Sequence, residues 1–493
     1  MQKKQTILVV ASLLVVVLSV TLAYFTAQII GKGKDVSVSS ADLKIIFTDS
    51  DGAISGSNIE PGWSDTKTFT VENNSKSEYK YNIVIKDLLN TFVTNGYLQY
   101  KITSTNGGYN MTEFKDVPKS SVATDTILAY SVVIPNGVTQ SYTIEFKYAN
   151  DESVDQSDDM GKKLSGKLFI TEGTEDPNKT LYNQLLADKS TVLTRTDFSK
   201  VLTTDNTKTL YTSTENGTTV YYFAGNAIDN WVKFGKNASN QDLYWRIIRT
   251  NSDGSVRLLY HGTSTTATDA YIGTSSFNSS YADTAYVSYM YGSLGSIPGA
   301  RENTTDSTIK TIIDNWYKDN LNTNYGKYLS TTAVYCNDRS TSDNTYFGAY
   351  TRLLTNKTPS YDCTATEDKF TVDSTVGNGK LTYPIALMTA DEVSFAGGLY
   401  GTNAPTWYYY NSANGSSTGS TFWWLLSPGV WSGSDAGVFY VYGSSSPGFL
   451  NNVNVFAGGG VRPVISLKSC IKYSTGNGSA SDPYTIQETT SGC

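Results

Sequence analysis

Short segments of alternating apolar and polar residues follow residue 35, and they constrain the fold more than any other feature of the chain. Seven of them lie at 42–48, 66–73, 79–89, 97–103, 129–134, 141–148 and 167–173. Alternation with a period of two sends successive side chains to opposite faces of a β-strand. Asn136 and Gly137 add a tight hairpin-turn signal between two of the segments. Because this region contains no convincing helical pattern, we predict an all-β immunoglobulin-like sandwich over residues 36–173.

An apolar run from Ile7 to Phe25 precedes this region and follows Lys3 and Lys4. As a helix, the run would be about 28 Å long, enough to cross the hydrocarbon core of a bilayer. The leading lysines place the N-terminus on the inner side. We therefore predict a transmembrane signal anchor or a long signal peptide in residues 1–30, with the remaining chain exported to the extracellular face of the membrane.

The cysteines agree with export. The chain has four, Cys336, Cys363, Cys470 and Cys493, and no Cys-x-x-Cys pair that would suggest zinc. Three disulfide connectivities are possible, and the economical one joins Cys336 to Cys363 and Cys470 to Cys493. Disulfides persist in oxidising compartments outside the cytosol, so these cysteines predict two bridges in an extracellular protein.

A connector and a second domain complete the chain. Residues 174–200 predict a connector with a short helix, capped by Asn178 and carrying Leu181, Leu185 and Leu186. Beyond residue 201, Asn216-Gly217 and Asp253-Gly254 predict two hairpins. Helical patterns span 306–321 and 389–398, the second with a capping box of Thr389 and Glu392. Helices among many short strands predict an α+β domain over 201–493.

Two resemblances follow from these residues. "LAYFTA" (22–27), "ADLKI" (41–45) and "IEPGWSDTKTFTVENNS" (59–75) resemble the camelysin-type and biofilm-matrix fibre proteins of Gram-positive bacteria. The blocks "YYFAG", "YWRIIRTNSDGSVRLLY", "DSTIKTIIDNWYKDNL", "VYCNDRS", "LTYPIALMTADEVSFAGG", "FWWLLSP" and "GVRPVISL" resemble a family of bacterial surface proteins of unknown function. That family implies a C-type-lectin-like fold of the formylglycine-generating-enzyme subtype. Some relatives with this fold are targets of diversity-generating retroelements, which vary a C-terminal binding face.

Several kinds of chemistry lack the residues they need. Only one histidine, His261, occurs in the chain, and we read it as structural at a strand end. The adjacent acids Asp391 and Glu392 do not indicate catalysis, because the capping box explains Glu392. The net charge of −7 argues against a nucleic-acid partner. The acidic loop 150–159 is a weak calcium candidate, and the sugar-binding triplets of calcium-dependent lectins are missing from 201–493. We predict no enzyme, metal or cofactor.

The segment 429–459 has the composition of a binding surface. Of the 33 residues from Pro428 to Gly460, 22 are Gly, Ser, Asn or aromatic, the mixture that binding loops favour. We interpret Val438, Val441, Leu450 and Val453 as framework, so that strand alternation turns the residues between them outward. The predicted contact residues are Val430, Trp431, Ser432, Ser434, Asp435, Phe439, Tyr440, Tyr442, Ser444, Ser445, Ser446, Phe449, Asn451, Asn452, Asn454 and Phe456. A glycine-rich meander whose aromatics pack in a core is the competing interpretation.

These observations predict a bacterial cell-surface protein that recognises an unknown protein or glycan ligand for adhesion. The segment "TWYYYNS" (406–412) is expected to extend the face, whereas Arg462 is expected to be buried and bonded to backbone carbonyls. A structural surface or biofilm-matrix component with no specific ligand is the alternative.

Overall fold

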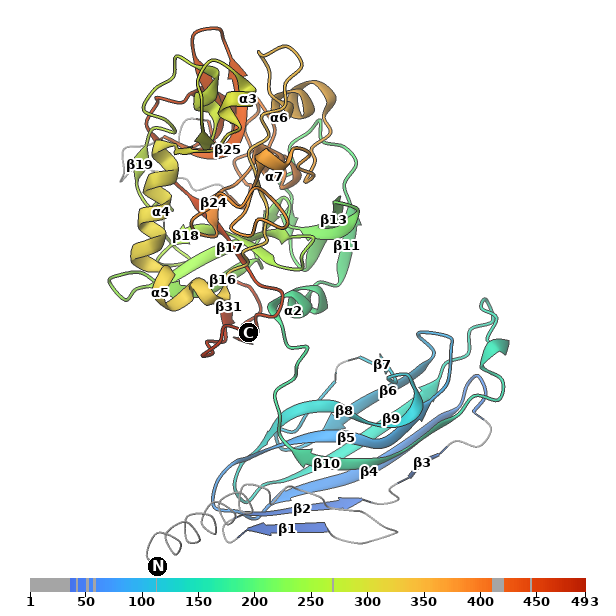
Figure 1. The fold of residues 1–493 in the computed structure, drawn as a ribbon. Helices are drawn as coiled ribbons and strands as arrows, with labels where there is room; N and C mark the ends of the chain where they lie inside the picture. Colours follow the sequence, from blue (N-terminus) through green and yellow to red (C-terminus); the bar gives the residue numbers. More distant parts are fainter. Residues whose placement is uncertain are drawn as a thin grey trace, which may run out of the picture. The chain divides into compact units, whose positions relative to one another are not determined.

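The structure is a computed structural model that describes residues 36–40, 43–49, 53–55, 59–111, 113–267, 270–409, 421–443 and 446–493. The predicted N-terminal anchor lies outside these residues. Among the residues that are described, no helix is both long and apolar enough to cross a membrane. The chain is mostly β with few helices, and it divides into the compact units Met1–Pro177 and Asn178–Cys493, called unit 1 and unit 2 below (Figure 1).

Unit 1 consists of two antiparallel sheets that share one core (Figure 1). The first sheet has the order β1 (Val36–Ser40), β2 (Leu43–Asp49), β4 (Ser64–Asn73), β9 (Thr139–Tyr148), β6 (Leu98–Ser104), β7 (Lys115–Asp116). The second has the order β3 (Ala53–Ser55), β10 (Leu164–Glu172), β5 (Tyr79–Asn90), β8 (Ser120–Ile134). Val71 and Ile144 of the first sheet are buried in the core with Ile83 and Leu168 of the second. All seven predicted segments are strands.

One sequence expectation for unit 1 meets a different outcome. Asn136-Gly137 does form a tight turn, with Gly137 at φ 71°, but it joins β8 to β9, which belong to different sheets, so it is not a hairpin. In the acidic loop, the Asp159 carboxylate is buried and accepts hydrogen bonds from Val93 N (2.6 Å) and Tyr148 Oη (2.8 Å). Across the described residues, no group of three or more His, Cys, Asp or Glu side chains is placed to hold a metal ion.

Unit 2 is built on a ten-stranded sheet. Seven of its strands follow the order β11, β13, β14, β17, β16, β31, β30. A branch leaves this path at β17, which also pairs with β18; β18 pairs with β29, and β29 pairs with β24. These strands are β11 (Thr191–Thr194), β13 (Thr209–Glu215), β14 (Thr218–Tyr222), β16 (Trp231–Lys236), β17 (Asp242–Thr250), β18 (Val256–Gly262), β24 (Ile385–Leu387), β29 (Pro463–Leu467), β30 (Tyr473–Thr475) and β31 (Tyr484–Ile486). The predicted hairpins at Asn216-Gly217 and Asp253-Gly254 are confirmed as β13–β14 and β17–β18.

A five-stranded sheet carries the predicted binding segment. Its order is β19 (Thr274–Ser275), β28 (Gly459–Gly460), β25 (Phe422–Trp431), β26 (Ala436–Tyr442), β27 (Leu450–Asn454). Short pairs join β12 (Asp205–Asn206) to β15 (Asn226–Ala227), β20 (Met290–Tyr291) to β21 (Thr305–Asp306), and β22 (Tyr335–Cys336) to β23 (Lys369–Phe370). The turn between β25 and β26 lies at one end of unit 2 (Figure 1).

The helices of unit 2 are short apart from α4. They are α2 (Leu181–Asp188), α3 (Ile297–Ala300), α4 (Thr308–Asn320), α5 (Asn322–Tyr325), α6 (Gly348–Tyr350), α7 (Ala390–Phe395), the 3₁₀ turns η2 (Thr284–Val287), η3 (Gly326–Tyr328) and η5 (Thr366–Asp368), and the π-helix η4 (Thr351–Asn356). The two predicted long patterns correspond to α4 and α7, and the capping box of Thr389 and Glu392 is confirmed. The predicted cap of α2 is wrong, because Thr180 rather than Asn178 accepts a hydrogen bond from Asn183 N.

Two disulfides stabilise unit 2. They join Cys336 to Cys363 and Cys470 to Cys493, which is the economical pairing among the three possible ones. The first closes a loop with a sequence separation of 27, and the second ties the C-terminal residue to the end of the β29 region with a separation of 23. Disulfides of this kind are typical of extracellular or secreted proteins.

Candidate functional site

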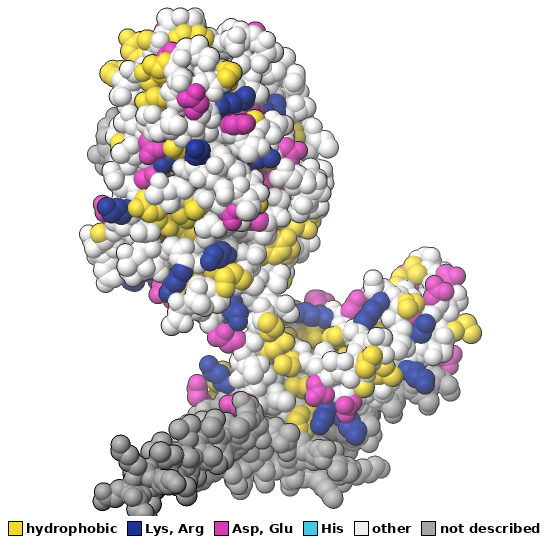
Figure 2. Space-filling view, viewed as in Figure 1, with side chains coloured by type: hydrophobic (Ala, Val, Ile, Leu, Met, Phe, Trp, Pro, Cys, Tyr) yellow, Lys and Arg dark blue, Asp and Glu magenta, His cyan; other side chains and the backbone are white. Residues whose placement is uncertain are grey.

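The predicted contact residues lie on β25, β26, β27 and the turns that join them. Figure 2 shows hydrophobic side chains gathered on the end of unit 2 where Figure 1 places β25 and α3. Ser432, Ser434 and Phe456 are exposed. Val430, Trp431, Asp435, Tyr442, Ser446, Phe449, Asn451, Asn452 and Asn454 are partly buried. Ser444 and Ser445 lie outside the described residues. The predicted set is divided between two ends of the sheet, because the β25–β26 turn lies at one end and Tyr442, Ser446 and Phe449 lie at the other.

Two predicted contact residues are wrong. Phe439 is fully buried, and Tyr440 is 8% exposed. The assignment failed because Val438 and Val441, three positions apart on β26, point to opposite faces of the sheet, and yet both are buried. The ring of Tyr440 packs on Phe422 with ring centroids 4.8 Å apart, on the face that holds Val438. Both faces of β26 are therefore covered over residues 436–441, and only Tyr442 at its end is partly exposed.

The exposed part of the site is the β25–β26 turn and its surroundings, which we call the tip (residues 430–436 and 454–456). The Ser432 hydroxyl accepts a hydrogen bond from Asp435 N (2.9 Å), closing the turn. Asp435 Oδ1 accepts one from Asn454 Nδ2 (2.7 Å), which ties the turn to the end of β27. Phe456 follows β27 and is 58% exposed. The tip is therefore a small-polar turn held in one conformation beside a large exposed aromatic ring.

Aromatic residues from other segments complete this surface, and the sequence reading missed them. Tyr281 is exposed and packs edge-on against Phe456, with ring centroids 5.9 Å apart. In a second group, which lies beside Phe439 of β26, Tyr346 stacks on Tyr350 (4.5 Å), and Tyr350 meets Tyr400 edge-on (5.9 Å). No local motif distinguishes these tyrosines among the 36 in the chain, so only the fold reveals that they surround the tip.

The segment "TWYYYNS" does not extend the face in its described part. Trp407, Tyr408 and Tyr409 are buried, and residues 410–412 lie outside the described residues. Arg462 donates to the backbone oxygens of Tyr409 (3.2 Å) and Tyr260 (3.2 Å), which confirms its predicted role as a buried fork. Burial lowers its pKa to about 10.

His261 is buried at the end of β18. Its ring packs edge-on against Trp231 with centroids 4.4 Å apart. Burial lowers the pKa of His261 well below its usual range, and the positive charges of Arg246 and Arg462 act in the same direction. The imidazole is therefore neutral at physiological pH, as expected for a packing residue.

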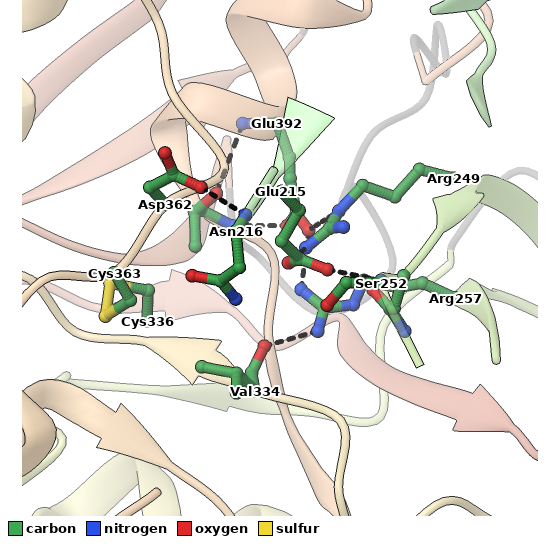
Figure 3. Close-up of polar contacts among 12 residues, drawn as sticks. Glu215, Asn216, Arg249, Ser252, Arg257, Val334, Cys336, Asp362, Cys363 and Glu392 are labelled. Atoms are coloured by element: carbon green, nitrogen blue, oxygen red, sulfur yellow. Dashed lines mark hydrogen bonds and ion pairs between the residues drawn. A yellow bond between two sulfur atoms is a disulfide. The ribbon is translucent and has the colours of Figure 1, made fainter. Parts of the chain in front are cut away.

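A buried ion-pair network lies beside the Cys336–Cys363 disulfide (Figure 3). Glu392 Oε1 accepts hydrogen bonds from Arg249 Nε (2.9 Å) and Arg257 Nη1 (2.6 Å), and its Oε2 accepts one from Thr389 N (2.9 Å). Glu215 accepts from Arg249 Nη2 (2.8 Å). Burial raises the pKa of Glu215, but Arg249 outweighs it and the result is about 2. Both carboxylates are thus ionised, and each accepts hydrogen bonds from arginine and from a backbone N–H.

The neighbouring carboxylates are engaged in the same way. Arg352 on η4 forms a two-pronged pair with Asp391, with both N–O distances 2.9 Å, and its Nη1 contacts Asp338 Oδ2 at 2.5 Å. These side chains line a pocket with about 380 Å³ of empty space, part of which is open solvent. A general acid or base needs a carboxylate that can exchange its proton with a substrate, and arginine pairing opposes that. The geometry instead joins α7, η4 and β17 into one rigid frame.

Comparison with known proteins yields little. No protein-family model matches the chain, and no curated protein matches it. The chain has a weak similarity to the solved structure of a ruminal GH26 endo-β-1,4-mannanase, with 15% sequence identity and a TM-score of 0.15. The match covers 29% of each chain, so this protein spans less than a third of the mannanase. A similarity this low carries no argument about fold or activity.

Proposed function

We propose that this protein is an extracellular recognition protein, and that the tip of unit 2 with its flanking aromatic residues binds a ligand without catalysis. The observation that carries the proposal is the convergence of exposed Tyr281, Tyr346 and Phe456 around the turn Ser432–Asp435. Exposed aromatic rings beside small polar residues are the composition of binding surfaces, because rigid rings give contact area at low entropic cost.

The engaged state of the neighbouring carboxylates supports binding rather than catalysis, and the two disulfides support an extracellular location. We further propose that unit 2 has the C-type-lectin-like fold that its sequence blocks resemble, and that unit 1 is an immunoglobulin-like stalk. In this proposal the N-terminal apolar run attaches the protein to a bacterial membrane. Diversification of the binding segment also remains a proposal, which the neighbouring DNA would test.

Two single variants test the proposed face. Phe456→Asp in the tip and Tyr346→Asp beside it replace exposed rings by a charge, which folding tolerates at exposed positions. Val192→Asp on β11 is the matched control, since Val192 is as exposed but belongs to the ten-stranded sheet. We expect at least one ligand on arrays of glycans and purified extracellular proteins to bind the wild type and the control. Both Asp variants of the proposed face should lose at least tenfold in affinity, and unchanged binding in both would refute the proposal.

A further inference from the structure

Three tyrosines form a continuous row on one side of the five-stranded sheet, which we call the tyrosine row (Tyr346, Tyr350 and Tyr400). Tyr346 and Tyr350 stack with an interplanar angle of 24°, and Tyr400 stands edge-on to Tyr350 at 67°. Tyr400 and Tyr350 also approach the buried ring of Phe439, with centroids at 6.1 and 6.5 Å. The row therefore rests on the core of the sheet and continues outward to Tyr346, which is 42% exposed.

Tyr346 is the exposed end of the tyrosine row. Tyr350 covers one face of its ring by stacking, so the exposed area of Tyr346 belongs to its outer face and edge. An aromatic ring with one covered and one free face presents a flat apolar platform to the solvent. Such a platform suits a ligand that is itself flat and apolar on one side.

The row is fixed in place before any ligand arrives. Tyr346 forms a β-bridge with Val430, and its backbone N–H donates to Asp343 Oδ1 (3.0 Å). Tyr350 immediately precedes the π-helix η4, and that helix is anchored by the paired contacts of Arg352 with Asp391. π-helical turns are rare and often occur at functional sites. These contacts hold the backbone, and the rings already pack on one another. Ligand binding to the row would therefore order few additional side chains.

The polar groups of the row are neutral. Asn452 Nδ2 donates to Tyr400 Oη (3.1 Å), which leaves the Tyr400 hydroxyl proton as a donor. The Asn452 Oδ1 atom accepts no hydrogen bond from the part of the chain that is described, so it can accept one from a ligand. Burial raises the pKa of Tyr350 and of Tyr400, and neighbouring tyrosines add to the effect. A lysine or arginine beside the rings would lower both pKa values, and none among the described residues contributes here. The row thus offers uncharged donors and acceptors beside a ring face.

We propose that the tyrosine row, together with Asn452, is a binding site for a neutral saccharide. A pyranose ring has an apolar face of C–H groups that stacks on an aromatic ring, while the hydroxyls at its edge pair with neutral amide and phenol groups. An anionic ligand would require arginine or lysine at the site. This inference deepens the proposed function and rests on it, because it names the ligand class for one side of the same surface.

Glycan binding by the purified full-length protein tests the inference. The probes are hexasaccharides of neutral sugars (cello-, xylo-, malto- and chito-oligosaccharides) and, for comparison, oligogalacturonate and heparin fragments. We expect at least one neutral probe to bind, with an affinity that changes less than threefold between 50 and 500 mM salt. Tyr346→Ala should weaken that binding at least tenfold, whereas Tyr346→Phe, which keeps the ring, should change it less than threefold.

Leu193→Ala is the matched control, since Leu193 is as exposed as Tyr346 but lies on β11 of the ten-stranded sheet. It should bind the neutral probe as the wild type does. The inference is overturned if no neutral probe binds, if Tyr346→Ala leaves binding intact, or if only acidic probes bind. If a protein ligand is instead lost in Phe456→Asp, the proposed function stands and the saccharide inference alone fails.

Discussion

Replacing Glu392 by Gln should destabilise unit 2 strongly, and the structure gives the magnitude. Gln is accepted in a capping box, so the variant tests mainly the charge. Glu392 is 1% exposed, and Arg257 has no other carboxylate partner among the described residues. Removing one partner of a buried pair costs about 3–5 kcal/mol because it leaves a buried charge without compensation. In Glu215→Gln, by contrast, Arg249 keeps Glu392, so we expect a loss of about 1.5–3 kcal/mol, the range for a charge-assisted hydrogen bond.

Urea unfolding followed by tryptophan fluorescence measures these losses. Seven of the eight tryptophans lie in unit 2, so the signal reports on that unit. The exposed Glu488→Gln is the control and should stay within about 0.5 kcal/mol of the wild type. The reasoning is refuted if Glu392→Gln loses less than about 1 kcal/mol of unfolding free energy, or if Glu215→Gln is the more damaging of the two.

Two further results are expected. The pKa of Glu215 is 4.5 when unperturbed and about 2 in the folded protein. The contribution of its carboxylate to the free energy of unfolding is therefore complete above pH 4.5 and is lost as the pH falls towards 2. That contribution is about 3 kcal/mol, and an acid titration of the unfolding midpoint should show a smaller drop in Glu215→Gln than in the wild type. Replacing Cys336 and Cys363 together by Ser should lower the free energy of unfolding by about 3–4 kcal/mol, because the bridge closes a loop of 27 residues in the unfolded chain. The same urea unfolding measures this loss, and an unchanged midpoint would argue against the bridge.

Unit 1 was predicted well because its signal is local. Each segment alternates in sequence, as in "TKTFTVEN" (66–73), and strand β4 buries every second residue over Phe69, Val71 and Asn73. The sheet order is not a local property. Nothing in the residues around Asn136-Gly137 shows that β8 and β9 belong to different sheets. The sequence therefore predicts the turn correctly, but it does not show that the two strands fail to form a hairpin.

The binding segment was predicted less well for a different reason. Alternation tells which residues share a face, but it does not tell whether the second face is covered. On β26 it is covered, and Phe439 and Tyr440 are both inside. The exposed positions are instead those at the strand ends and turns, such as Ser432, Ser434 and Phe456, where no neighbouring strand or helix can cover both sides.

Glu392 shows how a correct local explanation can hide a long-range role. The capping box accounts for the contact of Oε2 with Thr389, and the sequence predicts it from a spacing of three residues. The Oε1 atom of the same carboxylate holds Arg249 and Arg257, which are more than a hundred residues away in the chain. A residue whose local role is already satisfied gives no sign in the sequence of a second partner. The same argument applies to the tyrosine row, because Tyr400 lies fifty residues after Tyr350 and only the folded backbone brings it beside Tyr346 and Tyr350.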